Sequence, residues 1–504
     1  MKKISIILTA ALFAFTSCSD AYFDLYPTDS MTAENYLRDV SEIQTVLDAA
    51  YAGLRGEFGN SLVYIGDLPT DNAYDYKLNN SSAHISLHES TVDSQNSVIS
   101  DLWFASYKIV NRCCLVIEAM DKLNVTPEQY NKIVGQAEFL RGYVYYVMVR
   151  VWGDVPLVLE DIKDYMAVFD YGRTPVDKVY EQVIADLKDA ESKLPDFWPA
   201  AEKGKASATA AQAILGDVYL TRGDFTNAKT YFEKVISKEG ANLGLLEDYE
   251  SIFDSNNVNN KEVIFAIQYA HNQTPSLANY LGRAALGNIQ GIAIDPKNQG
   301  SKIFGVNVLM MTHELESKFI AGDKRRSVIY TNCVSPDYLC TIPMTLKYFD
   351  YQNVLDGNSG NNPDCGCHTI VSRYADILLK YAECLNETST PDAAIAQLKK
   401  VRDRAGLETK VDANKEAVKV AIANERQLEL CMEGHRWFDL VRTGKAIDVM
   451  TTFYKRTNAP DLHKTILQYE YGDNTAIDAH ELIYPIPYAQ HELNPDKLTQ
   501  NPGY

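Results

Sequence analysis

The chain has 504 residues, of which 67 are acidic and 48 are basic, so its formal net charge at pH 7 is −19. This acidic excess argues against nucleic-acid binding, which needs basic patches, and it suits a solvated surface and a neutral ligand. The length allows a large core, arranged either as about three domains or as one large helical body.

The amino terminus has the parts of a secretory signal. A basic start precedes a mostly apolar segment at residues 4–15, which ends shortly before Cys18. This segment is too short to span a bilayer, which needs about 20 apolar residues. One interpretation is an ordinary cleaved signal that has a cysteine near the cut. We favour a lipoprotein signal at residues 1–17, because the residues up to Cys18 resemble a lipobox, in which the cysteine carries the lipid.

Two kinds of segment alternate in the body that we expect at residues 18–504. Helical periodicity predicts a scaffold mainly in residues 34–54, 101–236 and 371–450. Residues 56–100 are rich in Gly, Asn, Ser and Tyr, so we predict a surface loop there. Residues 242–369 have weak periodicity, apart from one predicted strand in KEVIFAIQYA. Long irregular regions are usually functional or disordered. Apolar residues recur here and favour order, so we expect the ligand to bind mainly on loops in these two segments.

Two stretches have the residue spacing of tetratricopeptide helix pairs, in which small residues let two antiparallel helices approach. In the first stretch, the matching residues are Leu215, Gly216, Tyr219, Ala228 and Phe232. In the second, they are Tyr381, Ala382, Leu385, Ala394, Leu398 and Val401. We therefore predict a mostly α fold, with a tetratricopeptide-like helical repeat scaffold and a large irregular, loop-rich subdomain.

Four cysteines cluster in the irregular region, namely Cys333, Cys340, Cys365 and Cys367. In an exported protein they can form a disulfide, although the pairing cannot be read from sequence. Free thiols and a zinc site that includes the neighbouring His368 are the alternatives. The spacing matches no common zinc pattern, and we predict no metal site.

The stretch ERQLELCMEGHRWFDLVRTG concentrates charged residues in a helical pattern. It can be interpreted as acid/base chemistry, or as ion pairs on and between helices with Trp437, Phe438 and Leu440 in the core. We favour ion pairs. Three His-Glu pairs begin like a zinc-protease motif, but each lacks the second histidine. We therefore predict no catalytic residues and no cofactor.

Blocks along nearly the whole chain resemble the SusD/RagB-like nutrient-binding outer-membrane lipoproteins of the Bacteroidetes. The blocks are, in order, CSDAYFDLYPTDSMTAENY, AEFLRGYVYYVMVRVWGDVPLV, RTPVDKVYEQVIADLKDAESKLP, RYADILLKYAECLNE, VRDRAGL, ERQLELCMEGHRWFDLVRTG and YPIPYAQHELNPDKLTQNPGY. The resemblance implies a lipid-anchored protein on the outside of the outer membrane, which binds an oligosaccharide without cleaving it. It also implies a SusC-like TonB-dependent transporter as partner. The alternatives are a peptide-binding member of the same family and a helical glycoside hydrolase or lyase.

Sugar binding needs aromatic rings that stack on the apolar faces of pyranoses, with polar side chains around them. Residues of this kind are interleaved in the two predicted loop regions and in the PDFWPA loop. The candidates are Tyr64, Asp71, Asn72, Tyr74, Tyr76, Trp103, Trp198, Tyr280, Arg283 and Phe304. For each aromatic residue, the alternative is ordinary packing in the core.

Overall fold

The computed structural model describes most of the chain. It covers residues 37–75, 82–163, 165–286, 305–331, 343–350, 365–457 and 476–504, and the backbone of two short strands between 334 and 341. The predicted signal peptide, Cys18, Tyr76 and Phe304 lie outside the described residues.

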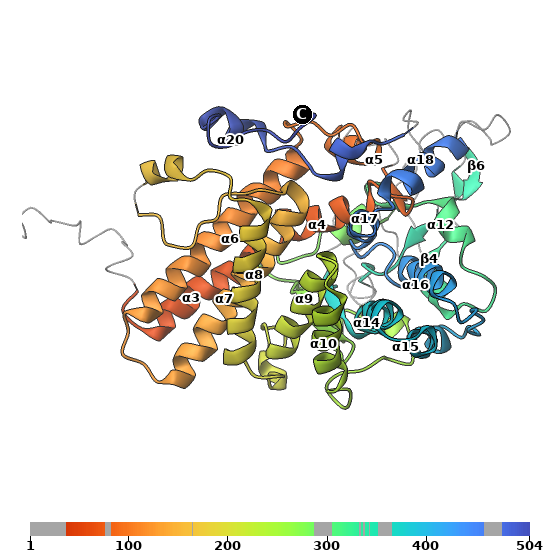
Figure 1. Ribbon diagram of the computed structural model, residues 1–504, viewed down its shortest axis with the longest axis horizontal. Helices are drawn as coiled ribbons and strands as arrows, with labels where there is room; N and C mark the ends of the chain where they lie inside the picture. The colour runs from red at the N-terminus through yellow and green to blue at the C-terminus, as the bar shows by residue number, and fades with distance from the viewer. Residues whose placement is uncertain are drawn as a thin grey trace, which may run out of the picture.

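Long helices form one half of the molecule, at the left of Figure 1. They are α3 (Val40–Gly53), α6 (Ser97–Asp121), α7 (Pro127–Trp152) and α8 (Val176–Lys193), and each packs on the next along the chain. The start of α7 is fixed by a capping box, in which Thr126 and Gln129 satisfy each other's backbone N–H groups. None of the helices in the described part of the chain is both long and apolar enough to cross a membrane.

The two predicted helix pairs are confirmed. The first is α9 (Ala208–Thr221) with α10 (Phe225–Ile236), and the second is α14 (Tyr374–Thr388) with α15 (Pro391–Arg404). Helix α10 packs against α14, so the pairs stack, and α16 (Lys415–Glu429) packs on the second pair. Figure 1 shows these helices beside one another in the lower part of the molecule. The prediction of a mostly α fold is correct.

Gly216 allows α9 and α10 to approach closely. A Cβ atom at this position would lie 2.4 Å from the ring of Phe232, whose side chain is fully buried. We expect Gly216→Ala to lower the free energy of unfolding by about 1–2 kcal/mol, because overpacking outweighs the gain in helix propensity. Urea unfolding measures this difference. Gly240→Ala is the control, because its Cβ meets nothing closer than 3.9 Å. Equal stability of the two variants would contradict the close contact.

One small sheet joins the two ends of the loop-rich segment that we predicted at residues 242–369. Strand β2 (Val263–Ile267) pairs antiparallel with β8 (Thr369–Arg373), so that Val263 lies opposite Arg373. The strand predicted in KEVIFAIQYA is therefore confirmed. The other pairs are β1 (Ala73–Tyr74) with β3 (Met310–Met311), β4 (Ile329–Tyr330) with β7 (Met344–Thr345), and β5 (Val334–Ser335) with β6 (Tyr338–Thr341).

The chain also contains shorter helices. In chain order they are α5 (Ser82–His88), η2 (Tyr165–Asp170), η3 (Ala200–Glu202), η4 (Glu250–Phe253), α11 (Leu281–Ala284), α12 (His313–Ser317), η5 (Lys324–Val328), α17 (Arg436–Arg442), α18 (Ala446–Thr457), η6 (Ala479–Leu482) and α20 (Tyr488–Leu493).

The prediction of a surface loop at residues 56–100 is wrong. This segment contains α4 (Glu57–Asp67), α5 and the start of α6, and most side chains of α4 are buried. Gly66 in this segment allows close packing. A Cβ on Gly66 would lie 2.1 Å from the carbonyl oxygen of Gly434, in the turn before α17.

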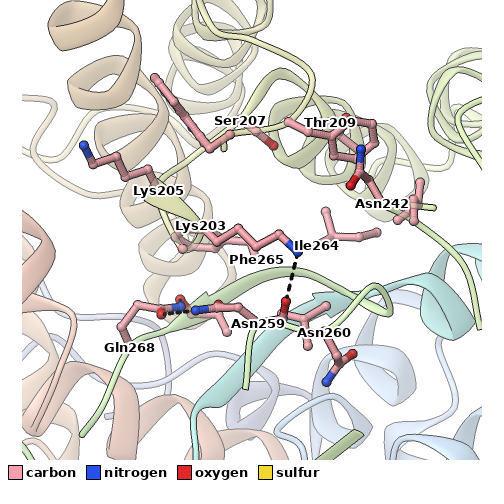
Figure 2. A pocket seen from close by; sticks show the side chains of 16 residues that line it. Lys203, Lys205, Ser207, Thr209, Asn242, Asn259, Asn260, Ile264, Phe265 and Gln268 are labelled. Atoms are coloured by element: carbon pink, nitrogen blue, oxygen red, sulfur yellow. Dashed lines mark hydrogen bonds between the residues drawn. The ribbon is translucent and has the colours of Figure 1, made fainter. Parts of the chain in front are cut away.

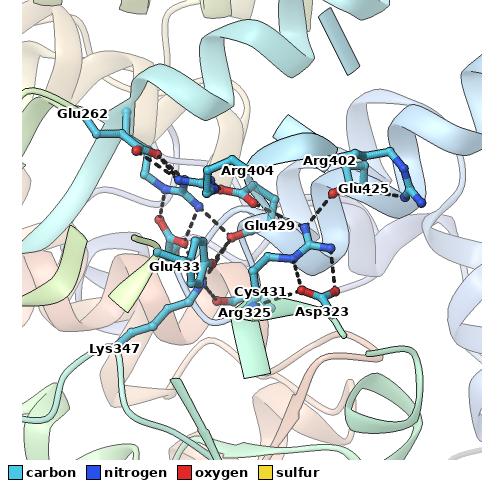
Figure 3. Close-up of polar contacts among 12 residues, drawn as sticks. Glu262, Asp323, Arg325, Lys347, Arg402, Arg404, Glu425, Glu429, Cys431 and Glu433 are labelled. Atoms are coloured by element: carbon cyan, nitrogen blue, oxygen red, sulfur yellow. Dashed lines mark hydrogen bonds and ion pairs between the residues drawn. The ribbon is translucent and has the colours of Figure 1, made fainter. Parts of the chain in front are cut away.

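The charged stretch at residues 425–444 is structural, as predicted, but its charges lie deeper than a helix surface. Helix α16 ends at Glu429, and its carboxylate contacts Arg325, Arg373 and Arg404. Figure 3 shows Glu429, Arg325 and Arg404 converging with Glu262, Asp323, Lys347, Arg402, Glu425 and Glu433. Arg373 joins them through its ion pairs with Glu262, Glu429 and Glu433. We call this group the ion network. The core positions predicted for Trp437, Phe438 and Leu440 are confirmed.

The described cysteines of the predicted disulfide region are free thiols. Cys365 donates to the carbonyl of Tyr348 at 3.1 Å, and Cys367 lies 3.6 Å from that of Phe253. Both side chains are buried and free, so the free-thiol alternative describes these two residues. A disulfide elsewhere in the cluster stays a prediction. The side chains of Cys333 and Cys340 lie outside the described residues.

Candidate functional site

Asp71 and Asn72, which the sequence suggested as ligand residues, belong to the interior. The Asp71 carboxylate accepts bonds from Arg436 Nε at 2.8 Å and from Gln427 Nε2 at 2.8 Å, and Gln427 also donates to Asn72 Oδ1 at 2.9 Å. Burial alone would raise the pKa of Asp71, but the Arg436 guanidinium and Lys318 lower it to about 2. These hydrogen bonds attach the segment before β1 to α16 and to Arg436. The polar groups of Asp71 and Asn72 are therefore bonded within the protein.

Trp103 and Tyr74 also lie in the core, as their packing alternative proposed. The ring of Trp103 meets Trp152 edge-on at 5.0 Å and lies 5.1 Å from Tyr107. Tyr74 is fully buried in β1, with its ring 6.2 Å from that of His88. Neither ring offers a face to solvent for stacking.

Tyr280 presents an aromatic ring to solvent. It immediately precedes α11, and its side chain is 43% exposed. The guanidinium carbon of Arg283, one turn further, lies 6.0 Å from the centre of the ring. An exposed ring beside a partly buried guanidinium combines an apolar face with hydrogen-bond donors.

Asn279 fixes the backbone that carries Tyr280. Its fully buried side chain donates to the carbonyl of Cys367 at 2.9 Å and to Thr369 Oγ1 at 3.1 Å, and it accepts from the N–H of Leu281 at 3.0 Å. Its own N–H donates to the carbonyl of Cys365 at 2.8 Å. The ring therefore projects from a backbone that is held to β8 and to the segment before it.

Tyr64 lies close enough to Tyr280 for the two hydroxyls to interact electrostatically, although α4 and α11 are far apart in the sequence. It is only 4% exposed, and its ring meets His84 edge-on at 4.6 Å. Burial raises the pKa of Tyr64 well above its usual value, and the nearby Tyr280 and Asp75 raise it further. Its hydroxyl has no hydrogen-bond partner among the residues that the structure describes. We call Tyr64, Tyr280 and Arg283 the Tyr280 ledge.

Trp198 lies elsewhere, in a pocket between the start of α9 and β2 (Figure 2). Its indole N–H donates to the carbonyl of Ala206 at 2.7 Å, and the ammonium groups of Lys132 and Lys205 lie 5.3 and 5.7 Å from its ring. The pocket opens to solvent, and its empty space is about 590 Å³ when that open solvent is counted. Its lining, called here the Trp198 pocket, is Phe197, Trp198, Lys203, Gly204, Lys205, Ser207, Thr209, Asn242, Leu243, Asn259, Asn260, Val263, Ile264, Phe265, Ala266 and Gln268.

The structure thus brings together three of the candidates in the ledge and places Trp198 apart from them. Sequence reasoning missed Asn279, Lys203 and Gln268. The only available signal was position, since Asn279 adjoins Tyr280 and Lys203 follows the PDFWPA loop.

One group of three possible metal ligands occurs within the described residues: Asp478, His480 and Glu481, whose ligand atoms lie within 4.8 Å of one another. These residues form the capping box of η6, in which Asp478 accepts from the His480 N–H and Glu481 accepts from the Asp478 N–H at 2.7 Å. Capping accounts for their proximity.

Comparisons with known proteins agree over most of the chain. Residues 326–504 match the family model described as the SusD family, and residues 22–220 match a model described as starch-binding associating with outer membrane. SusD-like protein P2 of Formosa agariphila is 27% identical and is aligned over 100% of both chains.

Solved structures share the fold. A SusD homolog from Bacteroides thetaiotaomicron superposes with a TM-score of 0.80 at 21% identity, covering 94% of this chain and 98% of its own. A laminarin-binding SusD-like protein superposes with a TM-score of 0.75 at 23% identity, covering 92% of this chain and 99% of its own.

Proposed function

Because the chain belongs to the SusD/RagB-like family, we propose that it is a surface lipoprotein that binds an oligosaccharide and passes it to a SusC-like TonB-dependent outer-membrane transporter. The names of similar proteins support this proposal: one solved relative is described as laminarin-binding, and one matching family is described as starch-binding and associated with the outer membrane. Binding without cleavage is the activity that these descriptions favour.

The Tyr280 ledge is the observation that carries the proposal. A pyranose has apolar C–H faces that stack on an exposed aromatic ring, and hydroxyl groups that accept from a guanidinium. Tyr280 and Arg283 offer both groups at one surface. In the proposed complex, the sugar ring lies on Tyr280 while Arg283 donates to its hydroxyls, and no bond of the sugar breaks.

The first test is binding of the soluble body, residues 19–504, which lacks the signal and Cys18, to a broad array of host, plant and algal glycans. A cluster of hits that share one linkage would support the proposal and identify the nutrient. Release of shorter sugars from the bound glycans would favour the hydrolase or lyase instead. Peptide binding with a blank glycan array would favour the peptide-binding alternative.

We expect Tyr280→Ala to weaken binding of the best glycan about tenfold, since the stacking contact is lost. Titration calorimetry measures the affinity, and the melting temperature should stay unchanged because the ring is half outside the core. Tyr488→Ala is the matched control, since this tyrosine is 47% exposed in α20, away from the ledge. An equal effect of the two variants would exclude the ledge as the binding surface.

A further inference from the structure

The Trp198 pocket differs in charge from the chain that forms it. Two lysines, Lys203 and Lys205, line it, and none of its lining residues is acidic, whereas acidic residues outnumber basic ones by 19 in the whole sequence. A second cavity beside η4 shows the opposite composition, because Asp248, Glu250 and Asp254 line it and no lysine or arginine does. The positive lining is therefore a local property of the Trp198 pocket.

In the described part of the chain, neighbouring carboxylates pair with only one of the two lining lysines, Lys205. Glu202 accepts from Lys132 at 2.8 Å and from Lys205 at 2.8 Å, and these contacts lower the pKa of Glu202 to about 2. One carboxylate thus already serves two ammonium groups. The third ammonium group, on Lys203, contacts the carbonyl of Asn259 at 3.4 Å, and within the described residues no carboxylate lies within ion-pair distance of it.

The remaining lining suits a saccharide. Figure 2 shows Lys203 reaching across the pocket toward Asn259, above the hydrogen bond from Asn259 Nδ2 to Gln268 Oε1 at 3.2 Å. The amide side chains of Asn242, Asn259 and Gln268 supply both donors and acceptors. The half-buried rings of Phe197 and Trp198 supply apolar surface. Positive charge, amide groups and aromatic surface together match a sugar that carries an anionic group.

We infer that the Trp198 pocket is a second saccharide site, which takes a sugar unit bearing a carboxylate or a sulfate, with Lys203 as the partner of the anion. None of the residues of the Tyr280 ledge lines this pocket. The inference rests on the proposed function for the saccharide class, while the charge preference rests on the pocket itself. It implies a glycan that contains acidic as well as neutral units.

The test uses titration calorimetry of the mature protein with two matched pairs of oligosaccharides. One pair is an oligogalacturonate and its methyl ester, and the other is a sulfated galactan oligosaccharide and its desulfated form. We expect one charged member to bind about tenfold more tightly than its neutral partner, with a preference that shrinks as salt rises. Preference for the uronate or for the sulfated sugar identifies the anion, and either result supports the site.

Variants locate the preference. Lys203→Ala should weaken binding of the charged sugar about tenfold and leave the neutral sugar unaffected, while Lys203→Arg should retain the preference. Lys410→Ala is the control, because this lysine is exposed and pairs with Glu408 away from the pocket. Tyr280→Ala should weaken the binding of both the charged and the neutral sugar and leave the ratio of their affinities unchanged.

Two results would overturn the inference while leaving the proposed function intact: equal affinities for charged and neutral sugars, or a charge preference that survives Lys203→Ala. If neither the array nor these pairs show any binding, the proposed function itself fails, and the second site fails with it.

Discussion

Replacing Arg373 by methionine is expected to lower the free energy of unfolding by about 3–5 kcal/mol, because breaking a buried ion pair leaves uncompensated charge. Arg373 is fully buried and donates to Glu262 at 3.0 Å, to Glu429 at 2.5 Å and to Glu433 at 2.8 Å. Urea unfolding followed by circular dichroism measures the loss. Lys399→Met is the control, since its ion pair with Asp403 is exposed and worth about 1 kcal/mol or less.

The same contacts make stability depend on pH in a defined direction. Burial by itself would raise the pKa of Glu429, but Arg404, Arg373 and Arg325 hold it well below its usual value. A carboxylate whose native pKa is depressed stabilises the fold fully above the unfolded pKa of roughly 4.3, and this contribution is lost as the pH falls below it. The difference in the free energy of unfolding between the native chain and Arg373→Met should therefore shrink below about pH 4. A difference that stays constant from pH 7 to pH 3 would contradict the role of the ion network.

Cys18→Ala is expected to remove the protein from the membrane fraction completely while leaving the body folded. A lipid on Cys18 would anchor the chain, since each buried CH₂ contributes about 0.8 kcal/mol and several acyl chains act together. Cell fractionation and metabolic labelling with a fatty acid measure the change. Cys384→Ala is the control, because this buried cysteine of α14 has no role in anchoring.

The anchoring experiment is cleanest in cells that lack the transporter, so that binding to the transporter cannot retain the variant. Persistent membrane association of Cys18→Ala in those cells would disprove the lipid tether.

The helix pairs could be predicted from the sequence because their signal is local. Gly216 and Ala228 lie on facing helices only 12 positions apart, and the same relative spacing recurs with Ala382 and Ala394. Small residues at such positions have one physical explanation, the close approach of two adjacent helices. The strand at β2 was also visible, since its apolar residues are contiguous and β-branched at Val263, Ile264 and Ile267.

The features that could not be predicted from the sequence depend on contacts between segments far apart in the chain. The composition of residues 56–100 suggested a loop, whereas Gly66 in this segment lies against the backbone of Gly434. Asp71 resembled a sugar ligand because Gln427 and Arg436, which saturate it, lie more than 350 positions away. Ion pairing near Glu429 was predicted, but its partners on β8 and η5 were not, since a charged residue in an irregular segment looks solvated. Trp198 was identified as an aromatic residue in a loop, but the residues that share its pocket, and so the charge of the pocket, could be seen only in the structure.

Asn279 has a consequence for how selective the Tyr280 ledge is. Its side chain and its own N–H make four hydrogen bonds that hold the backbone in place, so the proposed stacking of a sugar on Tyr280 would cost little backbone entropy. In the proposed complex, the ring can turn about its own side-chain bonds but cannot move with the loop. A sugar of another shape would then be accommodated by substitutions around α11 rather than by a movement of the backbone.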